Sequence, residues 1–128
     1  MIYLDSSVAL AGLLVEDRRP PPSLWQESLL SSRLLEYEVW VRLNARNLHG
    51  SHGSVASALI SRVSFIELKP EVLERVLKPF PFPVRTLDAL HLSSIAFLLA
   101  HGQTVELASY DERLVAAAGA LGVPAAAL

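Results

Sequence analysis

Apolar residues recur along the chain in two patterns, short runs typical of strands and longer segments with helical spacing. The runs at residues 1–4, 64–68 and 104–109 are rich in strand-forming residues, and a weaker run closes the chain at residues 123–128. Strands separated by helices are joined by crossover connections, which predicts a mainly parallel sheet. We therefore expect an α/β fold whose sheet is flanked by helices on both faces.

Helical spacing of apolar positions is found in several segments. We expect helices over residues 6–16, 33–47, 54–62, 70–77, 84–100 and 111–121. The stretches RRPPPS (18–23) and HGSHGS (49–54) contain helix-breaking residues, so loops are expected there. A length of 128 residues suits one domain spanning residues 1–128.

Charge and cysteine content narrow the function classes. The chain carries 11 Lys and Arg against 13 Asp and Glu, a formal net charge of −2, so no overall basic field attracts nucleic acid. Cysteine is absent, which excludes disulfides and thiolate metal ligands. Because no apolar run approaches the length of a bilayer span, we expect a cytoplasmic protein with no membrane association.

Three aspartates are candidates for a functional site, two of them at strand ends, where an α/β sheet usually binds ligands. Asp5 directly follows the first predicted strand, and Asp111 lies just past the strand at residues 104–109. Asp88 lies in the first turn of an apolar helix, where an unpaired carboxylate is costly. Structural roles are the alternative, since Asp5 and Asp111 suit helix caps and Asp88 offsets the helix dipole.

Convergence of these carboxylates would indicate a metal site. Carboxylates in a small site repel one another and raise one another's pKa values unless a cation neutralises them. With no cysteine and no clear histidine pair, the ligand set favours Mg²⁺ or Mn²⁺ over zinc. Such ions activate water and stabilise charge on a phosphoryl oxygen. The reaction this indicates is phosphodiester hydrolysis.

Two glutamates compete for a place in that site. Glu36 and Glu38 are two residues apart on a predicted helix, so they point in different directions. The apolar neighbours of Glu38 on the helix surface are Leu34, Leu35, Val41 and Ala45. Glu36 also has apolar neighbours, so the helical projection alone does not decide between them.

Four acidic blocks resemble those of PIN-domain ribonucleases. The blocks are IYLDSS, SRLLEYE, RTLDALHLSS and ASYDERL, and they occur in the family's order over nearly the whole chain. Within the family the chain looks most like VapC-type toxins, which are compact endoribonucleases of toxin–antitoxin pairs. The resemblance implies a PIN-like three-layer α/β/α fold with a mainly parallel central sheet.

The resemblance also implies the catalytic and metal-binding residues, which are Asp5, Glu38, Asp88 and Asp111. These carboxylates are expected to bind one or two Mg²⁺ or Mn²⁺ ions and to position the attacking water. The family spacing of Ser, Leu and Glu matches Ser32, Leu34 and Glu38, and leaves Glu36 out of register.

Two serines are candidates for support of the site. Ser6 either caps the first helix or bonds a ligand or a metal-bound water. Ser109, two residues before Asp111, stands where the family has Thr or Ser, which implies that it orients a carboxylate.

A histidine and an arginine are candidates for contact with substrate. His91 lies one helical turn beyond Asp88, where it is either a satisfied core histidine or a residue of the site. Arg85 is a candidate for contact with RNA phosphate, and it competes for this role with Arg33, Arg42 and Arg46.

The resemblance implies an RNA substrate, a cognate small antitoxin protein and a homodimer. The stretches LWQ and PFPFP are candidate docking sites for the antitoxin, with packing against the domain's own core as the alternative. A housekeeping nuclease of RNA processing is a second function within the family. A non-catalytic Mg²⁺-binding interaction domain is a third, although the chain lacks the paired acids of receiver modules. Dinucleotide binding is disfavoured, because no glycine-rich turn follows the first predicted strand.

Overall fold

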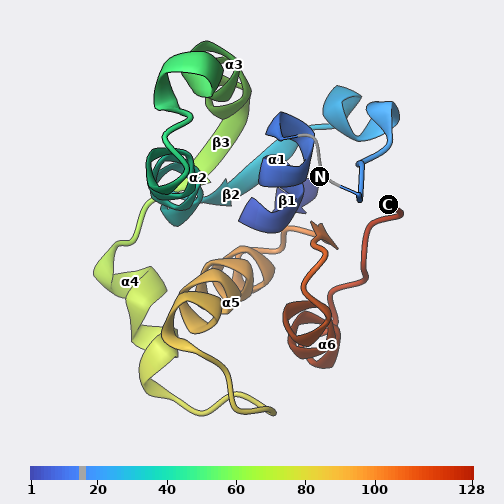
Figure 1. Cartoon of the computed structure of the whole chain (residues 1–128). Helices are drawn as coiled ribbons and strands as arrows, with labels where there is room; N and C mark the ends of the chain where they lie inside the picture. Colours follow the sequence, from blue (N-terminus) through green and yellow to red (C-terminus); the bar gives the residue numbers. More distant parts are fainter. Residues whose placement is uncertain (15–16) are drawn as a thin grey trace.

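Four parallel strands form the centre of an α/β fold (Figure 1). The computed structural model describes residues 1–14 and 17–128. Its strands are β1 (Ile2–Leu4), β2 (Leu29–Ser32), β3 (Val63–Ile66) and β4 (Glu106–Ala108). They lie in the order β3-β2-β1-β4, and each neighbouring pair is parallel. The mainly parallel sheet predicted from the sequence is confirmed.

Helices cover both faces of the sheet, which gives three α/β/α layers. One face is covered by α1 (Ser6–Leu13), α2 (Leu34–Ala45) and α3 (His49–Ser61), and the other by α5 (Thr86–Ala100) and α6 (Glu112–Ala120). The central strand β1 serves both cores, because successive side chains of a strand point to opposite faces. Ile2 and Leu4 pack with α1, α2 and α3, whereas Tyr3 packs with α5 and α6.

One strand of the sheet has no clear signal in the sequence. β2 pairs with both β1 and β3, yet its sequence LLSS ends in two serines that interrupt the apolar run. Both serines are fully buried. The Ser31 hydroxyl donates a hydrogen bond to the carbonyl of Leu4, and the backbone N–H of Ser32 donates to the Tyr3 hydroxyl. The Ser32 hydroxyl accepts a hydrogen bond from the backbone N–H of Leu34 at 3.2 Å, so both buried serine side chains have partners.

The expected loop at HGSHGS is wrong, because α3 begins at His49 and includes both glycines of this stretch. The chain turns earlier, at Asn47, whose φ of 56° ends α2 in the left-handed region. Gly53 lies beside α2, because a Cβ there would be 3.4 Å from the Trp40 ring, whereas a Cβ at Gly50 would meet nothing within 4 Å. Packing of α3 against α2 thus supports the helix despite the low helix propensity of glycine.

Other predicted elements are shorter than expected. The helix expected over residues 70–77 divides into α4 (Pro70–Leu73) and a 3-10 turn, η2 (Glu74–Leu77). The expected last strand is reduced to an isolated parallel bridge between Leu107 and Ala125.

The first helix and the loop after it also differ from expectation. α1 ends at Leu13, and Val15 and Glu16, where the helix was expected to continue, lie outside the described residues. The loop expected over residues 18–23 leads into a 3-10 helix, η1 (Pro22–Gln26). Within residues 1–14 and 17–128, no helix is both long enough and apolar enough to cross a membrane.

The early start of α3 predicts how two glycines respond to alanine. Gly50 is helical, and a Cβ there meets nothing within 4 Å. Gly50→Ala should therefore raise the free energy of unfolding by about 0.5–1 kcal/mol, because it restricts the unfolded chain. Urea denaturation measures the change.

Gly102→Ala is the matched control. Gly102 has a φ of +78°, so alanine there should lower the free energy of unfolding by about 1 kcal/mol. A destabilised Gly50→Ala variant would contradict the helical start at His49.

Candidate active site

The side of the sheet to which the chain adds strands reverses at β1, and the candidate site lies at this strand. From β1 the chain adds β2 and β3 on one side and returns to place β4 on the other. In such sheets a crevice for ligands opens at the carboxyl ends of the two strands that flank the switch. Asp5 follows β1 and Ser109 follows β4, so both lie at this edge.

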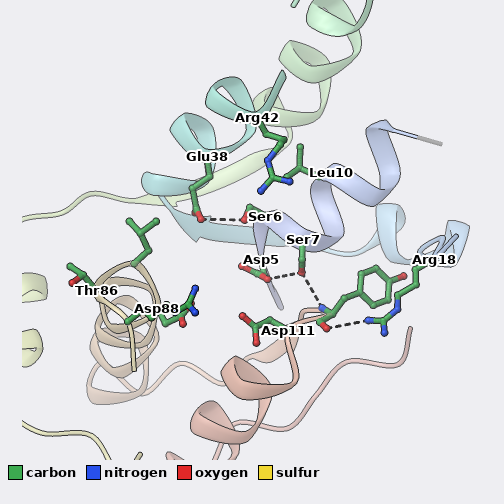
Figure 2. Close-up of a pocket in the computed structure, with 13 residues that line it drawn as sticks. Asp5, Ser6, Ser7, Leu10, Arg18, Glu38, Arg42, Thr86, Asp88 and Asp111 are labelled. Atoms are coloured by element: carbon green, nitrogen blue, oxygen red, sulfur yellow. Dashed lines mark hydrogen bonds between the residues drawn. The ribbon is translucent and has the colours of Figure 1, made fainter. Parts of the chain in front are cut away.

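A cavity of about 680 Å³ occupies this crevice. Its lining comes from the start of α1, from α2, from the start of α5 and from the turn after β4. The lining residues are Asp5, Ser6, Ser7, Leu10, Arg18, Glu38, Arg42, Arg85, Thr86, Leu87, Asp88, Tyr110 and Asp111. Figure 2 shows the four predicted carboxylates extending from separate parts of the chain toward a common space. The structure thus brings together Asp5, Glu38, Asp88 and Asp111.

Asp5 is held by two serine hydroxyls. Its side chain is buried, and Oδ2 accepts hydrogen bonds from Ser7 Oγ at 2.6 Å and Ser109 Oγ at 2.7 Å. Although Asp5 occupies the N-cap position of α1, its side chain makes no capping hydrogen bond. A simple capping role therefore does not account for this carboxylate.

The same two serines also fasten the turn after β4. Ser7 Oγ accepts a hydrogen bond from the backbone N–H of Tyr110 at 3.0 Å, and Ser109 Oγ accepts one from Asp111 at 2.9 Å. Ser109 was expected to orient a carboxylate, and the carboxylate that it contacts is that of Asp5. Sequence reasoning missed Ser7; its signal is a second hydroxyl two residues after Asp5.

Asp111 caps α6 and faces the cavity. Its Oδ1 accepts hydrogen bonds from the backbone N–H groups of Arg113 at 3.0 Å and Leu114 at 3.2 Å. The capping alternative considered from the sequence is therefore correct for this residue. It does not exclude a second role, because the capping bonds use one of the two carboxylate oxygens.

The environment of Asp88 disfavours the ionised form of its side chain. Burial raises its pKa, and the charges of Asp111 and Asp5 raise it further, against the opposing effect of His91 and Arg85. Like charges thus interact across the cavity, and a bound cation would relieve their repulsion.

Of the two glutamates, Glu38 lines the cavity, whereas Glu36 pairs with Arg33 at 3.4 Å outside it. Glu38 Oε2 accepts a hydrogen bond from Ser6 Oγ at 3.2 Å. The apolar neighbours of Glu38 on the helix surface do not all mark a buried face, because Val41 is 67% exposed. The buried residues of α2 are Leu35, Val39 and Leu43.

Ser6 and His91 both contact Glu38. Ser6 is the first residue of α1 and donates to Glu38, so it does not cap the helix by its side chain. His91 is 1% exposed and lies beneath the cavity, with Nε2 2.6 Å from Glu38 Oε1. It reaches the site through Glu38 and does not line the cavity itself.

The environment of His91 combines burial with nearby negative charge. Burial would lower the pKa of His91, but the hydrogen bond and charge of Glu38, together with Asp5 and Asp88, raise it above its ordinary value. The ring's other nitrogen, Nδ1, lies 2.8 Å from the hydroxyl of Tyr3, a fully buried residue that sequence reasoning missed.

Three arginines supply positive charge to the cavity, Arg18, Arg42 and Arg85. Arg85 was the sequence candidate, and Arg42 was one of its competitors. Arg33 is committed elsewhere, because it pairs with Glu67 at 2.7 Å and lies over the Phe65 ring. Arg18 was missed; it donates a hydrogen bond to the carbonyl of Tyr110 at 3.2 Å.

The donor set suits a hard cation, although the carboxylates are not gathered at coordination distance. Among residues 1–14 and 17–128, no group of three or more His, Asp or Glu side chains is close enough to hold a metal ion. The four carboxylates nevertheless share one cavity, and oxygen ligands are those that Mg²⁺ and Mn²⁺ prefer.

The two apolar stretches considered for partner docking differ in burial. In LWQ, Leu24 is buried and Trp25 packs on the core between the sheet and α1, α2 and α3, so this stretch contributes to the domain's own packing. In PFPFP, Phe80 packs on the second core, whereas Phe82 is 49% exposed beside a separate cavity of about 480 Å³.

Repulsion at Asp88 predicts that Asp88→Asn stabilises the metal-free protein. The folded state raises the pKa of Asp88, so the ionised side chain costs stability once the pH exceeds that pKa. At pH 7 the melting temperature should rise by about 1–2 °C, a modest gain because solvent screens part-exposed charges. Thermal melts in EDTA measure it.

The gain should disappear below about pH 4, where Asp88 is protonated in the wild type. Asp111→Ala is the contrasting variant, because loss of the α6 cap should lower stability by about 1 kcal/mol. A lower melting temperature for Asp88→Asn at neutral pH would contradict the proposed repulsion.

Comparison with known proteins adds no relative to this picture. No protein-family model matches the chain, and no curated protein matches it either. The likeness to PIN-domain ribonucleases therefore depends on the four acidic motifs.

Proposed function

We propose that the protein is a Mg²⁺- or Mn²⁺-dependent endoribonuclease of the PIN-domain type that acts as the toxin of a toxin–antitoxin pair. One observation carries the proposal. Carboxylates from four separate segments, Asp5, Glu38, Asp88 and Asp111, line one cavity at the carboxyl edge of a parallel sheet. Their order along the chain is that of the family's acidic motifs.

In the proposed site, two of the carboxylates are oriented by hydroxyl groups. Asp5 is fixed by Ser7 and Ser109, and Glu38 is fixed on one oxygen by Ser6. Orientation before binding lowers the entropic cost of assembling the reactive geometry. Asp5, Glu38, Asp88 and Asp111 would hold a divalent cation, which would supply activation of water and stabilisation of charge on a phosphoryl oxygen.

The substrate-binding role falls to the arginines of the cavity. Arg42 and Arg85 are exposed at its edge, and a guanidinium group binds phosphate through paired hydrogen bonds. Because the whole chain has a net charge of −2, these local charges have to supply the attraction for RNA. Binding of RNA should therefore weaken strongly with added salt.

The proposed partner is a cognate small antitoxin protein. In the family that this chain resembles, the antitoxin's C-terminal segment fills the active-site groove, and the cavity described above is the corresponding place. A homodimer and a cytoplasmic location are part of the same proposal.

Metal-dependent RNA cleavage is the direct test. The purified wild type should cut total RNA with Mg²⁺ or Mn²⁺ and stop when EDTA is added. Asp5→Asn and Asp88→Asn should each lower the cleavage rate by about 100-fold or more, since each removes a charged ligand. Mapping of cleavage sites on total RNA by sequencing measures activity and sequence preference together.

The two glutamates provide a matched pair of variants for this assay. Glu38→Gln should lose most of the activity, whereas Glu36→Gln, which alters a charge outside the cavity, should retain it. The reverse result would mean that the wrong glutamate is assigned. Undiminished cleavage by both aspartate variants would sink the proposed mechanism.

Toxicity separates a toxin from a housekeeping nuclease. Induced expression of the wild type in a bacterial host should stop growth, whereas Asp88→Asn at equal protein level should not. Growth curves and immunoblots measure this. Normal growth with a wild type that cleaves RNA in vitro would favour the housekeeping function.

A further inference from the structure

A chain of hydrogen bonds connects the centre of the sheet to the cavity. It begins at β2, where the backbone N–H of Ser32 donates to the Tyr3 hydroxyl at 3.1 Å. The Tyr3 hydroxyl lies 2.8 Å from Nδ1 of His91, and Nε2 of His91 lies 2.6 Å from Glu38 Oε1. The polar contacts thus run from a buried strand to a carboxylate that lines the cavity.

The two aromatic residues in this chain are immobilised by their surroundings. Tyr3 is 0% exposed and His91 is 1% exposed. Their rings meet edge to face, with an interplanar angle of 90° and centroids 5.9 Å apart. Tyr3 also packs with Leu92 and Ile95 in the second core. Neither ring can change position without disturbing the packing between the sheet and α5.

The direction of each hydrogen bond follows from its donors. Because Ser32 N–H donates to the Tyr3 oxygen, the Tyr3 hydrogen is available for Nδ1 of His91. In the neutral ring Nε2 then carries the proton and donates a hydrogen bond to Glu38, and in the protonated ring Nε2 donates the same bond. The other neutral tautomer would set the Nε2 lone pair against a carboxylate oxygen, which is unfavourable.

Glu38 is the member of this chain that needs to be held. Its long side chain, 21% exposed, would otherwise sample several rotamers. The Ser6 hydroxyl and the His91 ring engage different oxygens, Oε2 and Oε1 respectively. A carboxylate that accepts hydrogen bonds at both oxygens has a defined orientation. Residues that hydrogen-bond to metal ligands have the same orienting effect in other proteins.

We infer that Tyr3 and His91 are positioning residues that fix Glu38 from within the core, so that this carboxylate faces the cavity before any cation binds. The inference rests on the proposed function, since it gives Glu38 a cation to bind. It assigns a role to two buried residues that belong to the first and third acidic blocks but are not themselves acidic.

The test measures Mn²⁺ affinity by titration calorimetry, together with RNA cleavage. His91→Leu should weaken Mn²⁺ binding by about 10–100-fold. His91→Gln should restore affinity to within about threefold of the wild type, because its amide places a donor at the position of Nε2. His101→Leu, on the exposed end of α5, is the matched control and should bind as the wild type does.

A double-mutant cycle distinguishes positioning of Glu38 from a general structural effect. In a Glu38→Gln background, His91→Leu should cause no further loss of Mn²⁺ affinity. An equal loss in both backgrounds would overturn the inference, as would a folded His91→Leu variant with wild-type affinity. Failure of the Gln variant to restore binding would also overturn it.

Tyr3→Phe keeps the inference testable if His91→Leu does not fold. This variant retains the ring and removes the hydroxyl, so it should weaken Mn²⁺ binding by about threefold to 10-fold. Unchanged affinity in folded Tyr3→Phe would then overturn the inference. A wild type that binds no Mn²⁺ and cuts no RNA would refute the proposed function, and the inference would fall with it. If the wild type binds Mn²⁺ and cuts RNA, and the Tyr3 and His91 variants do the same, the inference alone would be refuted.

Discussion

The burial of the Asp5 carboxylate is the constraint on which the rest of the site depends. A buried charge is costly unless hydrogen bonds replace the lost water, and here Ser7 and Ser109 supply them at 2.6 and 2.7 Å. These hydroxyls come from the first turn of α1 and from the end of β4. Solvating one carboxylate therefore draws together two segments that are more than 100 residues apart. The same hydroxyls accept backbone N–H groups of the β4–α6 turn, which sets the start of α6.

The central strand connects this constraint to both cores. Asp5 follows Leu4, which packs under α1 and α2, while the preceding Tyr3 points to the opposite face among α5 and α6. A shift of β1 by one residue would exchange these faces and remove Asp5 from Ser109. The register of β1 against β4, in which Tyr3 pairs with Leu107 and Leu4 with Ala108, is thus a condition for the site as well as for the fold.

The sequence predicted those features that depend on local pattern or fixed spacing. The parallel sheet, the long helix of α5 and the placement of Asp5 and Asp111 after strands follow from periodicity and strand ends. β2 was missed because two serines interrupt its apolar run, and the carbonyl that satisfies the Ser31 hydroxyl belongs to Leu4, a partner distant in sequence. The start of α3 was misplaced because glycine weakens an isolated helix, whereas tertiary packing, such as that of Gly53 beside Trp40, overrides this local propensity. The contact between Glu38 and His91 could not be predicted either, because the two residues are 53 positions apart in the sequence.

The four carboxylates differ in how far the protein itself satisfies them, and this difference argues for their roles. Asp111 is satisfied on one oxygen by the N-terminus of α6, and Asp5 by serine hydroxyls. Asp88 has the opposite environment, because burial and two neighbouring carboxylates raise its pKa. Stability alone would favour a neutral residue at this position. Natural proteins commonly retain destabilising groups where function requires them. The unfavourable environment of Asp88 is one that the cation of the proposed function would relieve.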